Sequence, residues 1–298
     1  MKITYTRGLM ENLRNKSIEF IYKIFAKDCK DTENLKFESE YFNSVVNNFY
    51  NDLIIDKEPV EKPFMVRTAG QSGSGKTTQL LPSIKEGLPT NNYVHLAVRK
   101  FAKLHPNYNK LLQEFGDGLI REKTNGFALL CLFKSLELLI KNKYNVLFEV
   151  TILDPDFEEY VNRLAKFYNY FLIFNVLSVP FEVSNYFANK RMKESKIEKN
   201  RIVPQKTLDF FYEILPLGIE RIINISSIFD KNDYFIMWNI ISCENILVTN
   251  NFNKNILNLF NKNRIISGEL EVYLIENIEK KLEEKKKFYR EFFKNNKN

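Results

Sequence analysis

Short apolar runs alternate with amphipathic segments through the middle of the chain. The runs have the length of buried strands, and the segments between them carry apolar residues at helical spacing. The predicted strands are residues 64–69, 93–98, 145–150 and 171–179, with weaker patterns at 234–239 and 246–249. The predicted helices run from a Gly-rich segment to about Glu86, and over residues 121–142, 156–168, 182–194 and 204–219. This alternation predicts an α/β fold with a parallel sheet flanked by helices.

Helical patterns also precede and follow this region. Residues 9–27 and 40–55 predict two helices, and the long tail at 269–293 repeats apolar residues at every fourth position. The expected organisation is a helical N-terminal extension at 1–60, an α/β domain at 61–250 and a helical C-terminal extension at 251–298. The N-terminal helices are expected to dock on the core, or to shield a ligand site. The tail is expected to pack on the core, or to bind a partner.

Composition and charge narrow the class of protein. The 298 residues carry a formal net charge of +7, which suits an anionic partner such as a nucleotide or nucleic acid. The longest apolar stretch, residues 171–181, is too short to span a bilayer. Since the first eight residues also lack the apolar run of a signal peptide, we expect the protein in the cytoplasm, with no membrane partner.

Cysteine and histidine are too sparse to organise a metal or disulfide site. The three cysteines, Cys29, Cys131 and Cys243, lie far apart and form no Cys-x-x-Cys pair. His95 and His105 are the two histidines. A disulfide framework is therefore excluded, and a zinc site is not expected.

A Gly-rich segment directly after the first predicted strand fits the pattern G-x-x-x-x-G-K-[ST] of a phosphate-binding loop. Its residues are Gly70, Gln71, Ser72, Gly73, Ser74, Gly75, Lys76, Thr77 and Thr78. Glycines let backbone N–H groups turn towards phosphate oxygens, and the following helix presents its positive end to the anion. Lys76 is expected to reach the β- and γ-phosphates and Thr77 to ligate Mg²⁺. The segment predicts binding of a nucleoside triphosphate with Mg²⁺.

Four further motifs follow the loop in a fixed order. They are His105-Pro-Asn-Tyr108, residues 144–151 ending in Glu149-Val-Thr, Val179-Pro180 followed by Arg191, and Arg201-Ile-Val-Pro204. Their joint order and spacing over residues 62–220 resemble the zeta toxins, the kinase half of epsilon/zeta toxin–antitoxin pairs.

The resemblance implies a P-loop kinase fold that uses ATP, or GTP, with Mg²⁺. Zeta toxins phosphorylate a sugar hydroxyl of UDP-N-acetylglucosamine, and a small helical antitoxin inactivates them by covering the nucleotide site. For this chain the resemblance therefore implies a kinase acting on UDP-N-acetylglucosamine or a related small acceptor, and an antitoxin protein as partner.

The resemblance also assigns catalytic residues. Phosphoryl transfer needs positive charge around the transferred group, and Lys76, Arg191 and Arg201 are expected to supply it. Glu149 ends a buried strand, where the ligand sites of α/β sheets gather, and we expect its carboxylate to accept the proton of the acceptor hydroxyl.

The chain departs from the family pattern on the acceptor side. The family's D-x-D after the second strand falls on Ala97 and Arg99, and an arginine cannot accept a proton. The glycine of the family's E-G-T is Val150. Two alternatives therefore stay open: a kinase for another acceptor, including a nucleic-acid end, and a nucleotide-binding protein without transferase activity.

Overall fold

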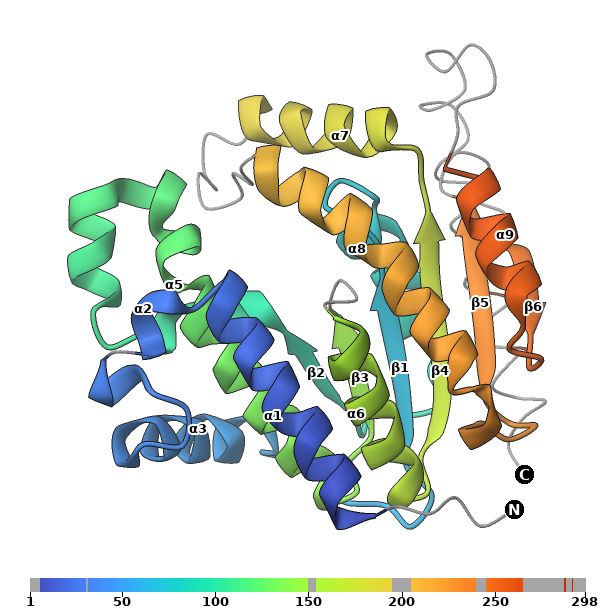
Figure 1. Ribbon diagram of the computed structural model, residues 1–298, viewed down its shortest axis with the longest axis horizontal. Helices are drawn as coiled ribbons and strands as arrows, with labels where there is room; N and C mark the ends of the chain where they lie inside the picture. Colours follow the sequence, from blue (N-terminus) through green and yellow to red (C-terminus); the bar gives the residue numbers. More distant parts are fainter. Residues whose placement is uncertain are drawn as a thin grey trace.

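Six strands form one sheet in the order β2-β3-β1-β4-β5-β6 (Figure 1). The computed structural model describes residues 6–30, 32–149, 154–194, 205–239 and 245–264, together with Lys287 and Glu291. The strands are β1 (Phe64–Ala69), β2 (Val94–Ala97), β3 (Val146–Glu149), β4 (Phe171–Ser178), β5 (Tyr234–Asn239) and β6 (Asn245–Thr249). The predicted α/β class and all six strands are confirmed.

The sheet is parallel from β2 to β5, and only its edge strand β6 runs antiparallel. The expectation of a parallel sheet was therefore wrong for this strand. A parallel pair needs a crossover of a dozen or more residues, whereas the connection from β5 to β6 spans only residues 240–244. The short connection favours the antiparallel return.

Helices cover both faces of the sheet. They are α1 (Arg7–Ile24), α2 (Lys27–Lys30), α3 (Glu40–Leu53), α4 (Leu81–Gly87), α5 (Tyr108–Lys141), α6 (Pro155–Phe167), α7 (Phe181–Glu194), α8 (Gln205–Asn224) and α9 (Lys254–Lys262). Successive side chains of β1 point to opposite faces of the sheet, so the hydrophobic core has two parts. Met65 packs in the cluster under α5, α6 and α8, and Val66 packs in the cluster under α4. In Figure 1, α6 and α8 lie across the first of these faces.

Two predicted helices have different limits in the structure. The helix expected over 121–142 begins at Tyr108 and continues through a kink at Gly116, where φ is 68°. Glycine adopts this left-handed conformation without strain, so two helical segments join there. The helix expected to run unbroken from the Gly-rich segment starts as a π-helical turn, and α4 begins only at Leu81. Pro82 thus lies in a first turn, where proline is tolerated.

The N-terminal helices are part of the main hydrophobic core, which confirms the expected docking. Leu13, Ile21 and Phe42 are buried in the same cluster as residues of α5, α6 and the sheet. Arg14 of α1 also donates to the carboxylate of Glu137 on α5 at 2.7 Å, and Glu137 is only 2% exposed. Removing these helices would therefore expose the core of the α/β unit.

Several predicted features lie outside the described residues. They are Arg201, residues 150–153 and the predicted tail helix at 269–293 apart from Lys287 and Glu291. Within the part of the chain that is described, no helix is both long enough and apolar enough to cross a membrane.

Candidate functional site

The Gly-rich loop leaves the carboxyl end of β1 and turns tightly through three glycines with positive φ: 153° at Gly70, 82° at Gly73 and 86° at Gly75. A Cβ atom at Gly73 would lie 1.9 Å from the carbonyl oxygen of Ser184, and one at Gly70 would lie 2.7 Å from Ser74 Oγ. No side chain fits at Gly73 without moving the backbone of α7. The pattern of glycines is thus a steric requirement of this loop.

Sheet topology brings other chain segments to the same edge. β1 lies between β3 and β4, and β2 lies beyond β3, all parallel. The carboxyl ends of parallel strands share one edge, where α/β proteins bind ligands. Glu149 at the end of β3 and the segment that follows β2 therefore face the loop.

Lys76 and Thr77, the loop residues expected to bind phosphate and Mg²⁺, both form hydrogen bonds within the protein. Lys76 Nζ donates to the carbonyl oxygens of Gly70 and Gln71, the second at 2.9 Å. Thr77 Oγ1 donates to Glu149 Oε1 at 2.6 Å. The structure thus brings Lys76, Thr77 and Glu149 together at this edge of the sheet.

Glu149 is the electrostatic centre of this group. It is 8% exposed, and its Oε2 lies 3.3 Å from His95 Nε2 and 3.6 Å from Arg99 Nη2. Burial alone would raise the pKa of Glu149, but the hydrogen bonds from His95 and Thr77 and the charges of Arg99 and Lys76 outweigh it and lower the pKa to about 2. The carboxylate is therefore fully ionised at neutral pH and binds protons weakly.

A second carboxylate with the opposite shift follows β3. Asp154 caps α6, where its Oδ2 accepts from the backbone N–H of Phe157 at 3.0 Å. Burial raises the pKa of Asp154 to about 6, with further contributions from the charges of Asp156 and Glu158. This value is close to that of a base working near neutral pH. The sequence places Asp154 just beyond the expected site, but gives no indication of its burial.

Gln71 fastens the loop to α7. Its side chain is 2% exposed, and Nε2 donates to Val179 O at 3.0 Å and to Ser184 Oγ at 2.8 Å. α7 carries Arg191 in its last turn. The sequence predicted Gln71 as a loop residue only. Its partners are more than a hundred positions away, so no local signal could have identified this contact.

The loop has the properties of a cradle for a nucleotide and Mg²⁺. Ser74 is 1% exposed, and its Oγ is buried without a hydrogen-bond partner, as is Gln71 Oε1. Gly70 and Gly73 place no side chain at the two tightest approaches of the loop, and Lys76 and Thr77 supply an ammonium group and a hydroxyl. This set of donors fits phosphate oxygens and a hard divalent cation. Ser72 lies in the loop, and Thr78 lies in the π-helical turn that follows it.

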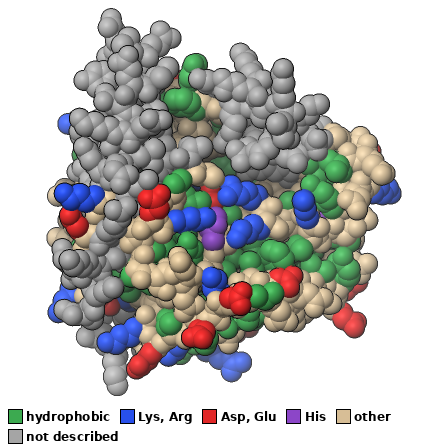
Figure 2. Space-filling model, turned by 180° about the vertical axis from the view of Figure 1, so that it is seen from behind, with side chains coloured by type: hydrophobic (Ala, Val, Ile, Leu, Met, Phe, Trp, Pro, Cys, Tyr) green, Lys and Arg blue, Asp and Glu red, His purple; other side chains and the backbone are tan. Residues whose placement is uncertain are grey.

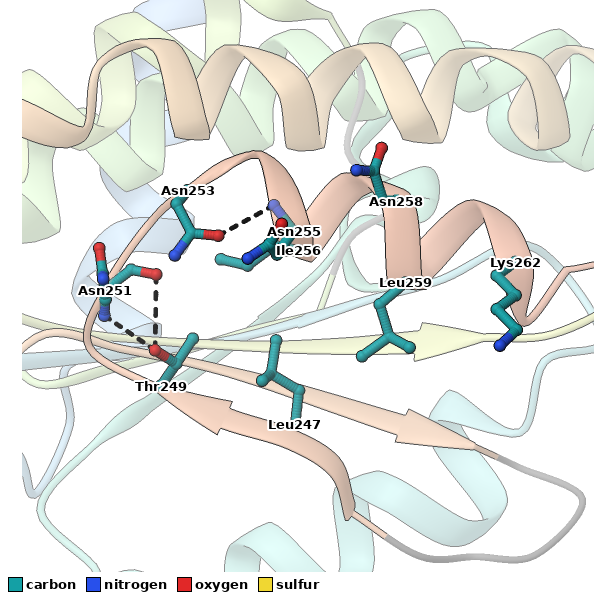
Figure 3. A pocket seen from close by; sticks show the side chains of 9 residues that line it. All are labelled: Leu247, Thr249, Asn251, Asn253, Asn255, Ile256, Asn258, Leu259 and Lys262. Carbon is teal, nitrogen blue, oxygen red and sulfur yellow. Dashed lines mark hydrogen bonds between the residues drawn. The ribbon is translucent and has the colours of Figure 1, made fainter.

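A cavity of about 440 Å³ lies elsewhere, between β6 and α9 (Figure 3). Asparagines and aliphatic side chains line it, and Thr249, Asn251, Asn253 and Asn255 form hydrogen bonds within its wall. β6 is the edge strand farthest from β2. The cavity is therefore separate from the loop site.

Comparisons with known proteins agree with this architecture. The family described as Zeta toxin matches residues 51–241. The toxin PezT of Streptococcus pneumoniae serotype 4 is 28% identical over 176 residues, which are 58% of this chain and 68% of PezT.

A solved structure from the PezAT chromosomal toxin-antitoxin system of the human pathogen Streptococcus pneumoniae superposes with a TM-score of 0.66 at 22% identity. The match covers 85% of this chain and 100% of that chain. The shared fold is that of the kinase-like toxins.

Proposed function

The chain belongs to the zeta toxin family, and from this we propose that it transfers a phosphoryl group from Mg·ATP to a hydroxyl of a small acceptor. UDP-N-acetylglucosamine is the first acceptor to test. The observation that carries the proposal is the loop itself, with its glycine-dependent turn and the contact between Thr77 and Glu149 at 2.6 Å. The family and its kinase-like fold support phosphoryl transfer as the type of reaction, whichever acceptor receives the group.

In this proposal the loop holds the donor. Backbone N–H groups of Gly70–Thr78 and the ammonium group of Lys76 would hold phosphate oxygens, and Thr77 Oγ1 would be a ligand of Mg²⁺. Mg·ATP, when bound, supplies the transferable γ-phosphoryl group. Lys76 Nζ donates to two carbonyl oxygens of the loop, so its ammonium group already lies against the loop.

Arg191 and Arg201 are proposed to stabilise charge on the transferred group. Positive side chains that surround this group lower the barrier because they are oriented before the reaction. The proposal for Arg191 is supported by its helix, because the first turn of α7 contacts the loop through Ser184 and Gln71, and Arg191 follows later on the same helix.

The acceptor proton is proposed to pass to a carboxylate. Glu149 remains our first choice for this role because it is in direct contact with Thr77. Its low pKa makes it a weak base, so Asp154, with a pKa of about 6, is the alternative. Glu149→Gln and Asp154→Asn, compared under the same conditions, distinguish the two. The variant that removes the base should have a kcat about 10²–10⁴-fold below that of the wild type, and it should keep its affinity for Mg·ATP.

An antitoxin is the proposed protein partner. The PezAT structure is described as part of a toxin-antitoxin system, and we propose that a small protein that covers the loop inhibits this chain. Co-expression with the product of the adjacent reading frame, followed by purification of a complex, tests this.

The function is tested with labelled ATP and a panel of acceptors that includes UDP-N-acetylglucosamine, nucleotides and oligonucleotide ends. We expect Mg·ATP to raise Tm and label to reach one acceptor class. Lys76→Ala should remove both effects, and Lys16→Gln, an exposed residue of α1, should change neither. A folded protein whose Tm is unchanged at millimolar Mg·ATP would contradict the proposal.

A nucleotide-binding protein without transferase activity is the second candidate. Arg99, which lies 3.6 Å from Glu149, favours it because a guanidinium replaces a carboxylate on the acceptor side. Binding of Mg·ATP without transfer to any acceptor would support this candidate.

A further inference from the structure

His95 contacts the central carboxylate of the site from the neighbouring strand. It lies on β2, and its Nε2 is 3.3 Å from Glu149 Oε2. His95 pairs with Leu147 in the sheet, and Glu149 follows Leu147 by two residues, so the side chains of His95 and Glu149 point to the same face. The proposed transfer of a phosphoryl group uses Glu149 but gives His95 no role.

The charge states of the two groups determine which atom donates in this contact. The pKa of Glu149, about 2, keeps the carboxylate ionised at neutral pH, and an ionised carboxylate only accepts hydrogen bonds. Burial lowers the pKa of His95, and burial together with the charges of Lys100 and Lys85 outweighs the opposite effect of Glu149. The imidazole is therefore neutral at pH 7, and its Nε2–H donates to Glu149 Oε2.

The other oxygen of the same carboxylate orients Thr77. Thr77 Oγ1 donates its single proton to Glu149 Oε1 at 2.6 Å. Because the proton points towards the carboxylate, the lone pairs of Oγ1 are directed elsewhere and can bind a cation. Thr77 is the loop residue proposed to bind Mg²⁺, which takes oxygen ligands. Two hydrogen bonds thus form one row from His95 through Glu149 to Thr77.

Cations around the carboxylate explain why it needs a fixed donor. Arg99 Nη2 lies 3.6 Å from Glu149 Oε2, but the Arg99 side chain is 50% exposed, and exposed ion pairs hold their geometry weakly. Figure 2 shows lysine and arginine side chains gathered around a histidine on the face opposite to that of Figure 1. The His95 side chain is only 11% exposed, and its own carbonyl oxygen accepts from Lys100 Nζ at 2.7 Å. His95 is therefore the more rigid support for the carboxylate.

We propose that His95 is a positioning residue for the metal side of the phosphate loop. Its N–H holds one oxygen of Glu149, and the other oxygen then keeps the lone pairs of Thr77 Oγ1 available to a divalent cation. Hydrogen-bond partners behind a metal ligand typically change metal affinity by about 10–100-fold. His95 stands one residue further back, so the lower end of this range applies. The inference rests on the proposed function, because it concerns how that site holds Mg·ATP.

Binding measurements without turnover test the proposal. The full chain is titrated by calorimetry with adenylyl imidodiphosphate, a non-hydrolysable ATP analogue, once with saturating Mg²⁺ and once with EDTA. The ratio of the two affinities reports the protein's own contacts to Mg²⁺, because the affinity of Mg²⁺ for the free analogue is the same for every variant. His95→Leu should reduce this ratio about tenfold and leave the affinity without Mg²⁺ unchanged. Leucine and the neutral imidazole are both uncharged, so the change reports orientation.

Three further variants identify the interaction responsible. His95→Gln carries a side-chain N–H donor in place of Nε2–H and should restore most of the ratio. Glu149→Gln should reduce the ratio at least as much as His95→Leu, and the double variant should lose no more than Glu149→Gln alone, because both changes break the same row of contacts. Lys16→Gln, an exposed lysine on α1, should keep the wild-type ratio. Thermal melts without ligand confirm that each variant is folded.

The outcomes separate this inference from the proposed function. A wild type that binds the analogue under neither condition defeats the proposed function and this inference with it. Normal wild-type binding with an unchanged ratio in His95→Leu defeats only the inference. Equal losses in His95→Leu and His95→Gln, or additive losses in the double variant, show that the N–H does not act through Glu149. A loss of affinity that is the same with and without Mg²⁺ makes His95 a structural residue of the loop and also overturns the inference.

Discussion

A buried ion pair under the loop strand allows a quantitative test of the fold. Arg67 of β1 and Glu158 of α6 form two parallel hydrogen bonds, of which Nη2 to Oε1 is 2.8 Å, and their side chains are 3% and 0% exposed. The rings of Phe148 and Phe174 lie 5.2 and 5.7 Å from the guanidinium. The pair therefore joins β1, the strand that leads into the loop, to α6, the helix that connects β3 to β4.

Removal of one partner should be far more costly than removal of both. Arg67→Met or Glu158→Leu leaves one buried charge without its partner, which typically costs about 3–5 kcal/mol in the free energy of unfolding. The double variant replaces the pair by apolar side chains among the aromatic rings, and it should lie within about 1–2 kcal/mol of the wild type. The coupling energy between the two sites is then several kcal/mol.

Urea denaturation followed by tryptophan fluorescence measures these differences, because Trp238, the single tryptophan, is 1% exposed in β5. The control is the exposed pair of Lys30 and Glu19, 55% and 64% exposed, where Glu19→Gln should change stability by less than about 1 kcal/mol. Single variants at Arg67 and Glu158 that cost less than about 1 kcal/mol, or that are additive, would refute the reasoning.

Three further predictions concern the site. Gly73→Ala should lower Tm and abolish the rise of Tm with Mg·ATP, because the alanine Cβ would lie 1.9 Å from Ser184 O. An unchanged rise of Tm with Mg·ATP would contradict this loop geometry. Gln71→Ala should lower kcat about tenfold with little change in Mg·ATP affinity, because it releases α7 from the loop. Exposed Gln113→Ala is its control, and equal kcat in both excludes a positioning role. The lowered pKa of Glu149 gives stability that is complete above its ordinary value of 4.5 and is lost as pH falls towards 2. Stability curves of wild type and Glu149→Gln should therefore converge at low pH, and parallel curves argue against the contacts of this carboxylate.

Local pattern was sufficient for the elements and for the turn of the Gly-rich loop. The strand at residues 64–69 and the glycines after it were predictable because burial and turn geometry depend on neighbouring residues. The same holds for Lys76 and Thr77, whose places are fixed by the turn that carries them. Helix limits were less certain, since only the structure reveals that α5 continues through Gly116.

Contacts between distant residues were decided by the tertiary structure. Strand order places β3 beside β1, so Glu149 meets Thr77, and it places β2 beside β3, so His95 and Arg99 reach the same carboxylate. The packing of α7 against the loop likewise pairs Gln71 with a partner more than a hundred residues away. The sequence by itself therefore determined which chemical groups this protein has and the local turns that hold them. Which charges share a site, and hence how strongly each holds its proton, depends on distances through space that only the packed sheet sets.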